Sequence, residues 1–192
     1  MFSIPCVVFA GGKSSRMGED KSLLPFGGYS TLGEFQYRRL QKIFSQVYIS
    51  TKNPEKFPFE ADCIVDESDL FAPTAGFVSI YRQLDAECFF VLGVDMPFVD
   101  EKIISAVMEA DSDKVDATLA QVDGEMESLC GIYHRSLQPH FEKMLRQNKH
   151  KLRRLLEETN TQQITFTDKR AFLNLNRPSE YQKAKELYDI IN

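Results

Sequence analysis

The chain has 192 residues, 43% of them hydrophobic and 27% charged, a balance typical of one globular domain with a sizeable core. Its 28 acidic and 23 basic side chains give a net charge of −5, which argues against a nucleic-acid partner because nucleic-acid binders usually carry a basic surplus. The four cysteines include no CxxC pair and the three histidines lack metal-ligand spacing, so the sequence indicates neither a zinc site nor a redox motif.

The first half of the chain alternates between strand-like and helix-like patterns. Cys6–Ala10 is an apolar run of the kind expected for a strand that is buried on both faces of a parallel sheet. A loop that contains glycine and serine follows, through Lys21. The patterns then predict, in order, a helix over Leu32–Phe44, strands at Val47–Ser50 and Cys63–Val65, a helix over Ala75–Leu84 and a central strand at Cys88–Leu92.

The second half continues this alternation. Asp100 is a suitable N-cap for a helix over Glu101–Ala110. The turn signal Asp123-Gly124 separates the strand patterns Ala117–Val122 and Ser128–Tyr133, which predicts a hairpin or a looped-out pair. The remaining predicted elements are helices over Leu137–Gln147 and Lys151–Glu158, a short strand at Ile164–Phe166 and a last helix that begins near Pro178.

This order of elements predicts one α/β domain over residues 1–192, with a Rossmann-like, mostly parallel, doubly wound sheet and helices on both faces. Ligands of such sheets bind beyond the carboxyl ends of the strands, which selects residues 11–21, residues 66–76 and the segment that begins at Asp95. The apolar N-terminal run lacks a basic segment, and no apolar stretch reaches the ~18–20 residues that span a bilayer. We therefore expect a cytoplasmic protein without a membrane partner.

The loop from Ala10 to Lys21 has the composition of a phosphate-binding site. The paired glycines Gly11 and Gly12 let the backbone approach a ligand closely, and successive backbone N–H groups can hold an anion. Hydroxyl and cationic side chains follow in the same loop, at Ser14, Ser15, Arg16 and Lys21. The loop is not a P-loop, because Val7 stands where that motif requires glycine. A flexible turn would explain the two glycines alone but not the added side chains.

The segment AGGKSSRMGEDK, residues 10–21, resembles the signature of the molybdenum cofactor guanylyltransferases (MobA-type), within the larger GGxSxRMGxxK group of nucleotidyltransferases. Later segments are similar to further motifs of this family, in the same order: Pro73–Gly76, Val94–Phe98, Ser128–Tyr133 and Asn174–Pro178. The resemblance therefore extends over nearly the whole chain. The sequence departs from the family pattern at Ala72, Thr74 and Glu127-Ser128, positions that concern the base pocket and the acceptor side.

The resemblance implies a nucleotidyltransferase fold and a Mg²⁺-dependent transfer of GMP from GTP to the terminal phosphate of molybdopterin, or of its metal-loaded form, with release of pyrophosphate. Residues 1–100 would form the nucleotide-binding half and residues 101–192 the acceptor-binding half. The residues expected to contact GTP are Ala10, Gly11, Gly12, Ser14, Lys21, Asp66 and Asp95. The family also implies transient contact with other cofactor-biosynthesis or target proteins.

The candidate catalytic residues are Arg16, Lys21 and Asp95, and Asp95 is also the candidate metal ligand. Asp95 follows an apolar strand, where an unpaired carboxylate is costly beside the core and a bound Mg²⁺ would offset that cost. The alternative is a turn aspartate before Met96-Pro97. Arg16 and Lys21 are expected to contact the triphosphate and the charge that develops on pyrophosphate. For these two, the alternative is a solvated surface cation.

Three further side chains are candidates for substrate contacts. Asp66, at a predicted strand end, could accept from the N–H donors of guanine, or it could be a turn residue. Asn174 and Asn176 alternate and would share one face of an extended segment. The resemblance directs both to the acceptor or the metal, and the alternative is local turn bonding before Pro178. It also makes Gly12 favour guanine, because related cytidylyltransferases carry Ala-Gly at this place.

Rival functions stay open. One is a cytidylyltransferase or a sugar-nucleotide pyrophosphorylase that uses the same loop. The other is a nucleotide-binding protein without catalysis, against which the joint presence of Arg16, Lys21 and Asp95 argues. The basic run at residues 149–154 could receive the phosphate of the acceptor, but a solvated helix face is the favoured interpretation.

Overall fold

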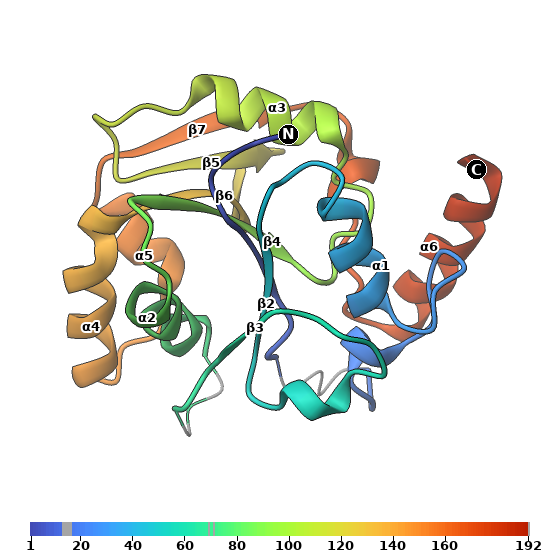
Figure 1. Ribbon diagram of the computed structural model, residues 1–192. Helices are drawn as coiled ribbons and strands as arrows, with labels where there is room; N and C mark the ends of the chain where they lie inside the picture. Colours follow the sequence, from blue (N-terminus) through green and yellow to red (C-terminus); the bar gives the residue numbers. More distant parts are fainter. Residues whose placement is uncertain (13–16, 69, 71, 192) are drawn as a thin grey trace.

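The computed structural model describes residues 1–12, 17–68, 70 and 72–191. Within them, seven strands form one sheet in the order β3-β2-β1-β4-β6-β5-β7 (Figure 1). The strands are β1 (Cys6–Phe9), β2 (Val47–Thr51), β3 (Cys63–Val65), β4 (Cys88–Gly93), β5 (Ala117–Val122), β6 (Glu125–His134) and β7 (Thr161–Phe166). All neighbouring strands pair in parallel except β6, which is antiparallel to both β4 and β5. The predicted mostly parallel α/β sheet is confirmed.

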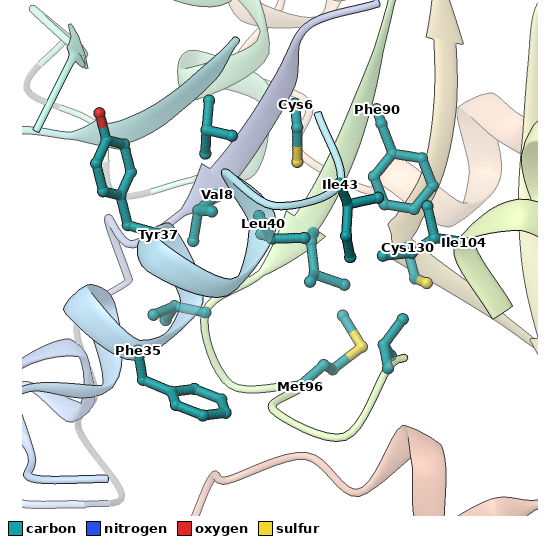
Figure 2. Packing of buried hydrophobic residues seen from close by; sticks show 14 of the residues in the cluster. Cys6, Val8, Phe35, Tyr37, Leu40, Ile43, Phe90, Met96, Ile104 and Cys130 are labelled. Carbon is teal, nitrogen blue, oxygen red and sulfur yellow. The ribbon is translucent and has the colours of Figure 1, made fainter. Parts of the chain in front are cut away.

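Helices cover both faces of this sheet, as predicted, and each face has its own core. On one face pack α1 (Leu32–Leu40), α3 (Glu101–Ala110) and α6 (Pro178–Ile191), and Figure 2 shows part of that core. On the other face pack α2 (Pro73–Gln83), α4 (Gln138–Arg146) and α5 (Leu152–Glu157) (Figure 1). Strand β1 serves both cores, because Val8 packs in the first and Val7 in the second. None of the described helices combines the length and the apolar character that crossing a membrane requires.

The bounds of three predicted elements differ from the structure by three residues or more, and one of them is β6, which begins at Glu125 and not at Ser128. Helix α1 ends at Leu40, four residues before the predicted end, although Ile43 and Phe44 are buried. A turn follows the helix and places the Phe44 ring against the rings of Phe2 and Phe90, so the apolar spacing outlasts the helix. Strand β7 begins earlier than predicted, at Thr161, because its edge position tolerates polar side chains and weakens the apolar signal.

The hairpin and the helix cap that the sequence predicted are confirmed. Strands β5 and β6 pair directly across Asp123 and Gly124, whose φ angles of 54° and 74° suit a tight two-residue turn between twisted strands. The Asp100 side chain accepts a hydrogen bond from Ile103 N at 2.9 Å and caps α3. Short 3-10 turns complete the fold at Lys21–Leu23, Pro54–Lys56, Arg135–Leu137 and Lys169–Phe172.

Candidate active site

A pocket lies at the carboxyl edge of the sheet, where the ends of β1, β2, β3 and β4 meet. Its walls also include the first turn of α2 and one residue of β6, Leu129. Six of the predicted nucleotide contacts line this pocket: Ala10, Gly11, Gly12, Lys21, Asp66 and Asp95. The predicted contact Ser14 and the catalytic candidate Arg16 lie outside the described residues. The edge that the sequence selected for ligand binding therefore carries a pocket.

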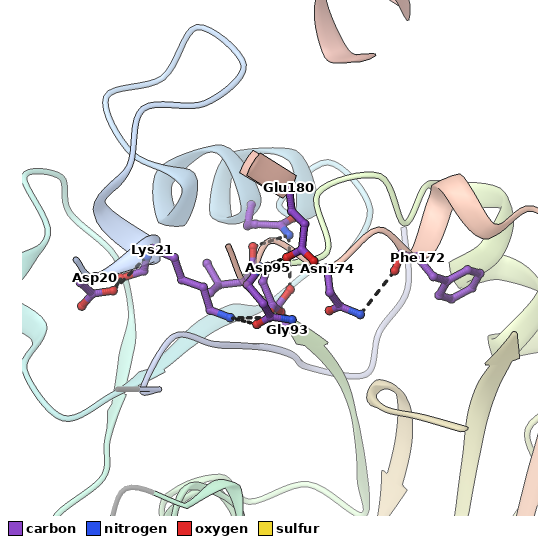
Figure 3. Close-up of polar contacts among 11 residues, drawn as sticks. Asp20, Lys21, Gly93, Asp95, Phe172, Asn174 and Glu180 are labelled. Atoms are coloured by element: carbon purple, nitrogen blue, oxygen red, sulfur yellow. Dashed lines mark hydrogen bonds and ion pairs between the residues drawn. The ribbon is translucent and has the colours of Figure 1, made fainter. Parts of the chain in front are cut away.

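Three segments that are distant in the sequence bring the side chains of Lys21, Asp95 and Asn176 together (Figure 3). Lys21 Nζ donates to Asp95 Oδ2 at 2.5 Å and to Asn176 Oδ1 at 2.9 Å. Lys21 begins the 3-10 turn after the glycine loop, Asp95 follows β4, and Asn176 precedes α6. The side chains of Lys21 and Asp95 are each 15% exposed, so this cluster is partly desolvated but still open to a ligand.

The segment from Asn174 to Asn176 is held against Asp95 through its backbone. Leu175 N donates to the carbonyl oxygen of Asp95 at 3.0 Å, and Asn176 N donates to Glu180 Oε2 in the first turn of α6 at 2.8 Å (Figure 3). Asn174 Nδ2 donates to a carbonyl oxygen two residues earlier at 3.4 Å, which is the local bonding considered as its alternative role. The two asparagines thus lie near the same cluster but have different partners.

Glu127 lies beside this cluster, and the sequence marked it only as a departure from the family pattern. The pairing of β4 with β6 ends at Leu92 and Cys130. Strand β6 continues beyond this point and so carries Glu127 toward Asp95. Burial raises the pKa of the Glu127 carboxyl, a hydrogen bond from Asn174 opposes this rise, and the charge of Asp95 adds to it. A second partly buried carboxylate therefore lies close enough to Asp95 to feel its charge.

Helix α1 supports the loop that carries Asp95, a role for which the sequence held no signal. The Gln36 amide and the Arg39 guanidinium donate, at 2.7 to 3.5 Å, to the carbonyl oxygens of Gly93, Val94, Met96 and Val99. Arg39 Nε also donates to Gln36 Oε1 at 2.6 Å, and Gln36 is fully buried. Burial lowers the pKa of Arg39 to about 10, and the guanidinium stays charged at neutral pH. We refer to Gln36 and Arg39 as the α1 clamp.

Gly93 leaves room for two neighbouring side chains. A Cβ atom there would lie 2.6 Å from Asp95 Oδ1 and 2.9 Å from Met96 Cε, both closer than real contacts allow. The last residue of β4 thus leaves room for the Asp95 carboxylate to fold back over the strand end. This close approach and the α1 clamp together set the position of Asp95.

Lys56 joins the two ends of the glycine loop. Its Nζ donates to the Ala10 carbonyl oxygen at 3.0 Å and to Asp20 Oδ2 at 2.7 Å. Asp20 also accepts from Ser22 N at 3.0 Å and thereby caps the 3-10 turn that begins at Lys21. Burial on its own would raise the pKa of Asp20, but the hydrogen bonds from Lys56 and Ser22 hold it below its usual value.

Asp66 lines the pocket with a carboxylate that already has protein partners. Its Oδ2 lies 3.2 Å from Lys52 Nζ, while Oδ1 accepts from Ser68 N at 3.0 Å and from Ser79 Oγ at 3.4 Å. The turn role considered from the sequence is therefore present. A base bound in the pocket would share the Asp66 oxygens with these partners.

Comparison with known proteins identifies the family. Residues 6–164 match the family described as MobA-like NTP transferase domain. The chain belongs to this family. The molybdenum cofactor guanylyltransferase of Campylobacter jejuni is 37% identical over 182 residues, which cover 94% of both chains. The Helicobacter pylori protein of the same name is 32% identical over 191 residues, covering 96% of this chain and 93% of that protein.

A solved structure supports the fold. The molybdopterin-guanine dinucleotide biosynthesis protein A of Archaeoglobus fulgidus is similar with a TM-score of 0.83, over 97% of this chain and 100% of that one, at 22% identity. The predicted nucleotidyltransferase fold is therefore confirmed. Membership of the MobA-like family also confirms that the chain is a nucleotidyltransferase.

Proposed function

We propose that this chain transfers GMP from GTP to the terminal phosphate of molybdopterin or of its metal-loaded form. An acceptor phosphate oxygen would attack the α-phosphorus, and the bond to the departing pyrophosphate would break. The observation that carries the proposal is the cluster of Lys21, Asp95 and Asn176, in which Lys21 and Asp95 line the same pocket as Gly11 and Gly12. The substrates are inferred from the names of the relatives, and the charges of this cluster are suited to such anionic substrates.

The residues of the chain would act by positioning and by charge. The acceptor phosphate is already ionised, so no side chain has to serve as nucleophile. Lys21 would exchange part of its contact with Asp95 for the phosphates and so stabilise the charge on leaving pyrophosphate. The backbone N–H groups of Gly11 and Gly12 would approach the triphosphate closely, and Ser14 and Arg16 are proposed to add contacts from the same loop.

Magnesium fits the donors of this cluster. The carboxylates of Asp95 and Glu127 and the amide oxygen of Asn176 are oxygen ligands of the kind that Mg²⁺ prefers. When bound, Mg²⁺ supplies positive charge to the triphosphate oxygens. Asp95 would hold the ion, and the α1 clamp would keep the Asp95 loop in place while Lys21 turns to the substrate.

The two halves of the chain would divide the substrates. Among the residues that the structure describes, those that line the pocket fall within residues 1–100 except Leu129, which fits a nucleotide-binding first half. Asn174 and Asn176 would approach the acceptor from residues 101–192, and Asp66 would help to select guanine. We also propose a cytoplasmic location, since the four cysteines are all free thiols, and transient contact with the proteins that supply the acceptor or receive the product.

Calorimetric titration with GTP, CTP and ATP, with and without Mg²⁺, tests this proposal. We expect GTP to bind about tenfold or more tightly than the other two nucleotides, and Mg²⁺ to strengthen its binding. Lys21→Gln should weaken GTP binding about tenfold, because a charged hydrogen bond to phosphate is lost. The exposed Lys42, which is outside the pocket, provides the matched control Lys42→Gln and should bind GTP normally.

A turnover assay with α-labelled GTP and molybdopterin then follows the transfer itself. Label that appears in a molybdopterin dinucleotide supports the proposal. A preference for CTP would instead assign the chain to cytidylyl transfer with the same fold. Absence of nucleotide binding both with and without molybdopterin would overturn the assignment of this pocket.

A further inference from the structure

A cluster of potential metal ligands lies at the amino end of β4, and the pocket lies at the other end of this strand. Cys88 is the first residue of β4 and His134 the last of β6, and the two are directly opposite each other in the antiparallel register. Asp111 follows α3, whose buried side chains belong to the same core against which Cys88 packs. Strand β4 thus runs from this cluster to Gly93, beside Asp95, and separates the two sites by its whole length.

The ligand atoms of this cluster converge. Cys88 Sγ, a carboxylate oxygen of Asp111 and a ring nitrogen of His134 all lie within 4.8 Å of one another. His134 Nε2 is 3.0 Å from Asp111 Oδ1 and 3.1 Å from Oδ2. Both side chains are 15% exposed, so the cluster is shielded but open to an ion from solvent. Thr118 Oγ1 donates to Asp111 Oδ1 at 2.7 Å and orients the carboxylate.

The types of these ligands select a class of metal. Thiolate, imidazole and carboxylate together suit Zn²⁺ and similar borderline ions, whereas Mg²⁺ and Ca²⁺ require oxygen ligands. At zinc bond lengths, ligand atoms of a tetrahedral site are roughly 3.5 Å apart, so small side-chain adjustments would bring these three atoms into place. The hydrogen bond from Thr118 is the kind of outer contact that fixes a ligating carboxylate.

We propose that Cys88, Asp111 and His134 form a metal site, separate from the Asp95 site, that binds Zn²⁺ or a similar borderline divalent ion. Binding replaces the Cys88 thiol proton, which passes to solvent, and the thiolate and carboxylate together balance the two charges of the ion. A water molecule or another small ligand completes the fourth position. The bound ion ties the end of α3 to β4 and β6, and so stabilises this edge of the sheet.

Cobalt(II) is the probe for this site, since a thiolate bound to Co²⁺ gives a characteristic near-ultraviolet charge-transfer absorption. The full chain without an affinity tag is stripped with a chelator and titrated with Co²⁺, and then with Zn²⁺ as competitor. We expect one thiolate-bound Co²⁺ per chain, displaced by Zn²⁺ but not by excess Mg²⁺. Zinc at about 100 times its Kd should raise the Tm by roughly 5–10 °C. Cobalt held by oxygen ligands at Asp95 would not produce this absorption.

Variants separate this site from other thiols. Cys88→Ser should abolish the absorption, and His134→Gln should weaken Co²⁺ binding at least about tenfold, as expected for loss of one ligand. Cys63→Ser is the matched control, because Cys63 is the other partly exposed cysteine while Cys6 and Cys130 are fully buried. An absorption that survives Cys88→Ser, or its absence in the unaltered chain, would overturn the proposal. Circular dichroism of each variant checks that it is folded, and His134→Gln provides the test should Cys88→Ser fail to fold.

Discussion

The two edges of the sheet hold their polar groups in different ways. At the carboxyl edge, long lysine side chains on short turns and loops reach carboxylates from other segments: Lys21 to Asp95, Lys56 to Asp20 and Lys52 to Asp66. At the opposite edge, the register of β4 and β6 brings the short side chains of Cys88 and His134 together, and Asp111 meets them from α3. Lysines on loops can exchange partners when an anionic substrate enters. Groups fixed by strand register suit a permanent ligand or a structural role.

The largest expected effect comes from the carboxyl edge. Asp95→Asn removes the charge that is proposed to hold the metal and leaves a side chain of nearly the same size. We expect kcat/KM for GMP transfer to fall about 10²–10³-fold and the Mg²⁺ dependence of GTP binding to disappear. Steady-state kinetics and calorimetry measure these effects, and the Tm should remain close to that of the unaltered chain.

Asp100→Asn is the control for this prediction. It makes the same charge change five residues further along, and asparagine caps a helix as well as aspartate does, so α3 should keep its cap. Equal losses of activity in Asp95→Asn and Asp100→Asn would mean that general charge, and not a ligand at Asp95, governs turnover.

A smaller effect is expected from the α1 clamp. Its two residues hold the loop that carries Asp95, but they do not line the pocket. Arg39→Met removes the donors to the Met96 and Val99 carbonyl oxygens and leaves the buried Gln36 oxygen without its partner. We expect a loss of about 1–3 kcal/mol in the free energy of unfolding and a fall in kcat of about tenfold, because the Asp95 loop is less well positioned.

The affinity for Mg²⁺ distinguishes positioning from stability. If the α1 clamp positions Asp95, Arg39→Met should weaken Mg²⁺ binding in the GTP complex at temperatures where the variant is fully folded. The neighbouring Arg38 has a side chain that is 40% exposed and a long ion pair of 4.0 Å to Glu34, so Arg38→Met is the control and should change neither quantity appreciably. Unchanged Mg²⁺ affinity in Arg39→Met would reduce the clamp to a purely structural feature.

Local patterns in the sequence were sufficient for the fold, and they also marked Lys21 and Asp95, which the structure brings together at the pocket. An apolar run that ends at Asp95, or a glycine loop that ends at Lys21, is complete within a few residues and needs no partner to be recognised. Gln36 and Arg39 have no such signal, because they look like ordinary polar positions of a helix and their partners are carbonyl oxygens 57 to 60 residues away. Side chains that meet across neighbouring strands are hidden from sequence analysis for the same reason, because their partners are distant in the sequence.

The cysteines and histidines of this chain show no metal-ligand spacing along the sequence. The local sequence did not predict that Cys88 and His134 would be paired, because the β4–β6 register brings them together from distant parts of the chain. Glu127 shows the same limit, since β6 carries it to Asp95 only once the strands have paired. Site residues that depend on register or on backbone partners therefore emerge only from the folded structure.

The smallest expected effect concerns the ion pair between Asp20 and Lys56 at the base of the glycine loop. The pKa of Asp20 is held below its usual value in the folded chain, so the pair contributes its full stability above the pKa of the unfolded state, near pH 4. That contribution is lost as the pH falls through the lower pKa of the folded state.

In Asp20→Asn, the cap on Ser22 can persist while the ion pair is absent. The difference in unfolding free energy between the unaltered chain and Asp20→Asn should therefore be constant near neutral pH and shrink below about pH 4. Urea unfolding at a series of pH values measures this difference. Growth of the difference in acid would show that Lys56 does not depress the pKa of Asp20, and would remove the electrostatic link between the two ends of the loop.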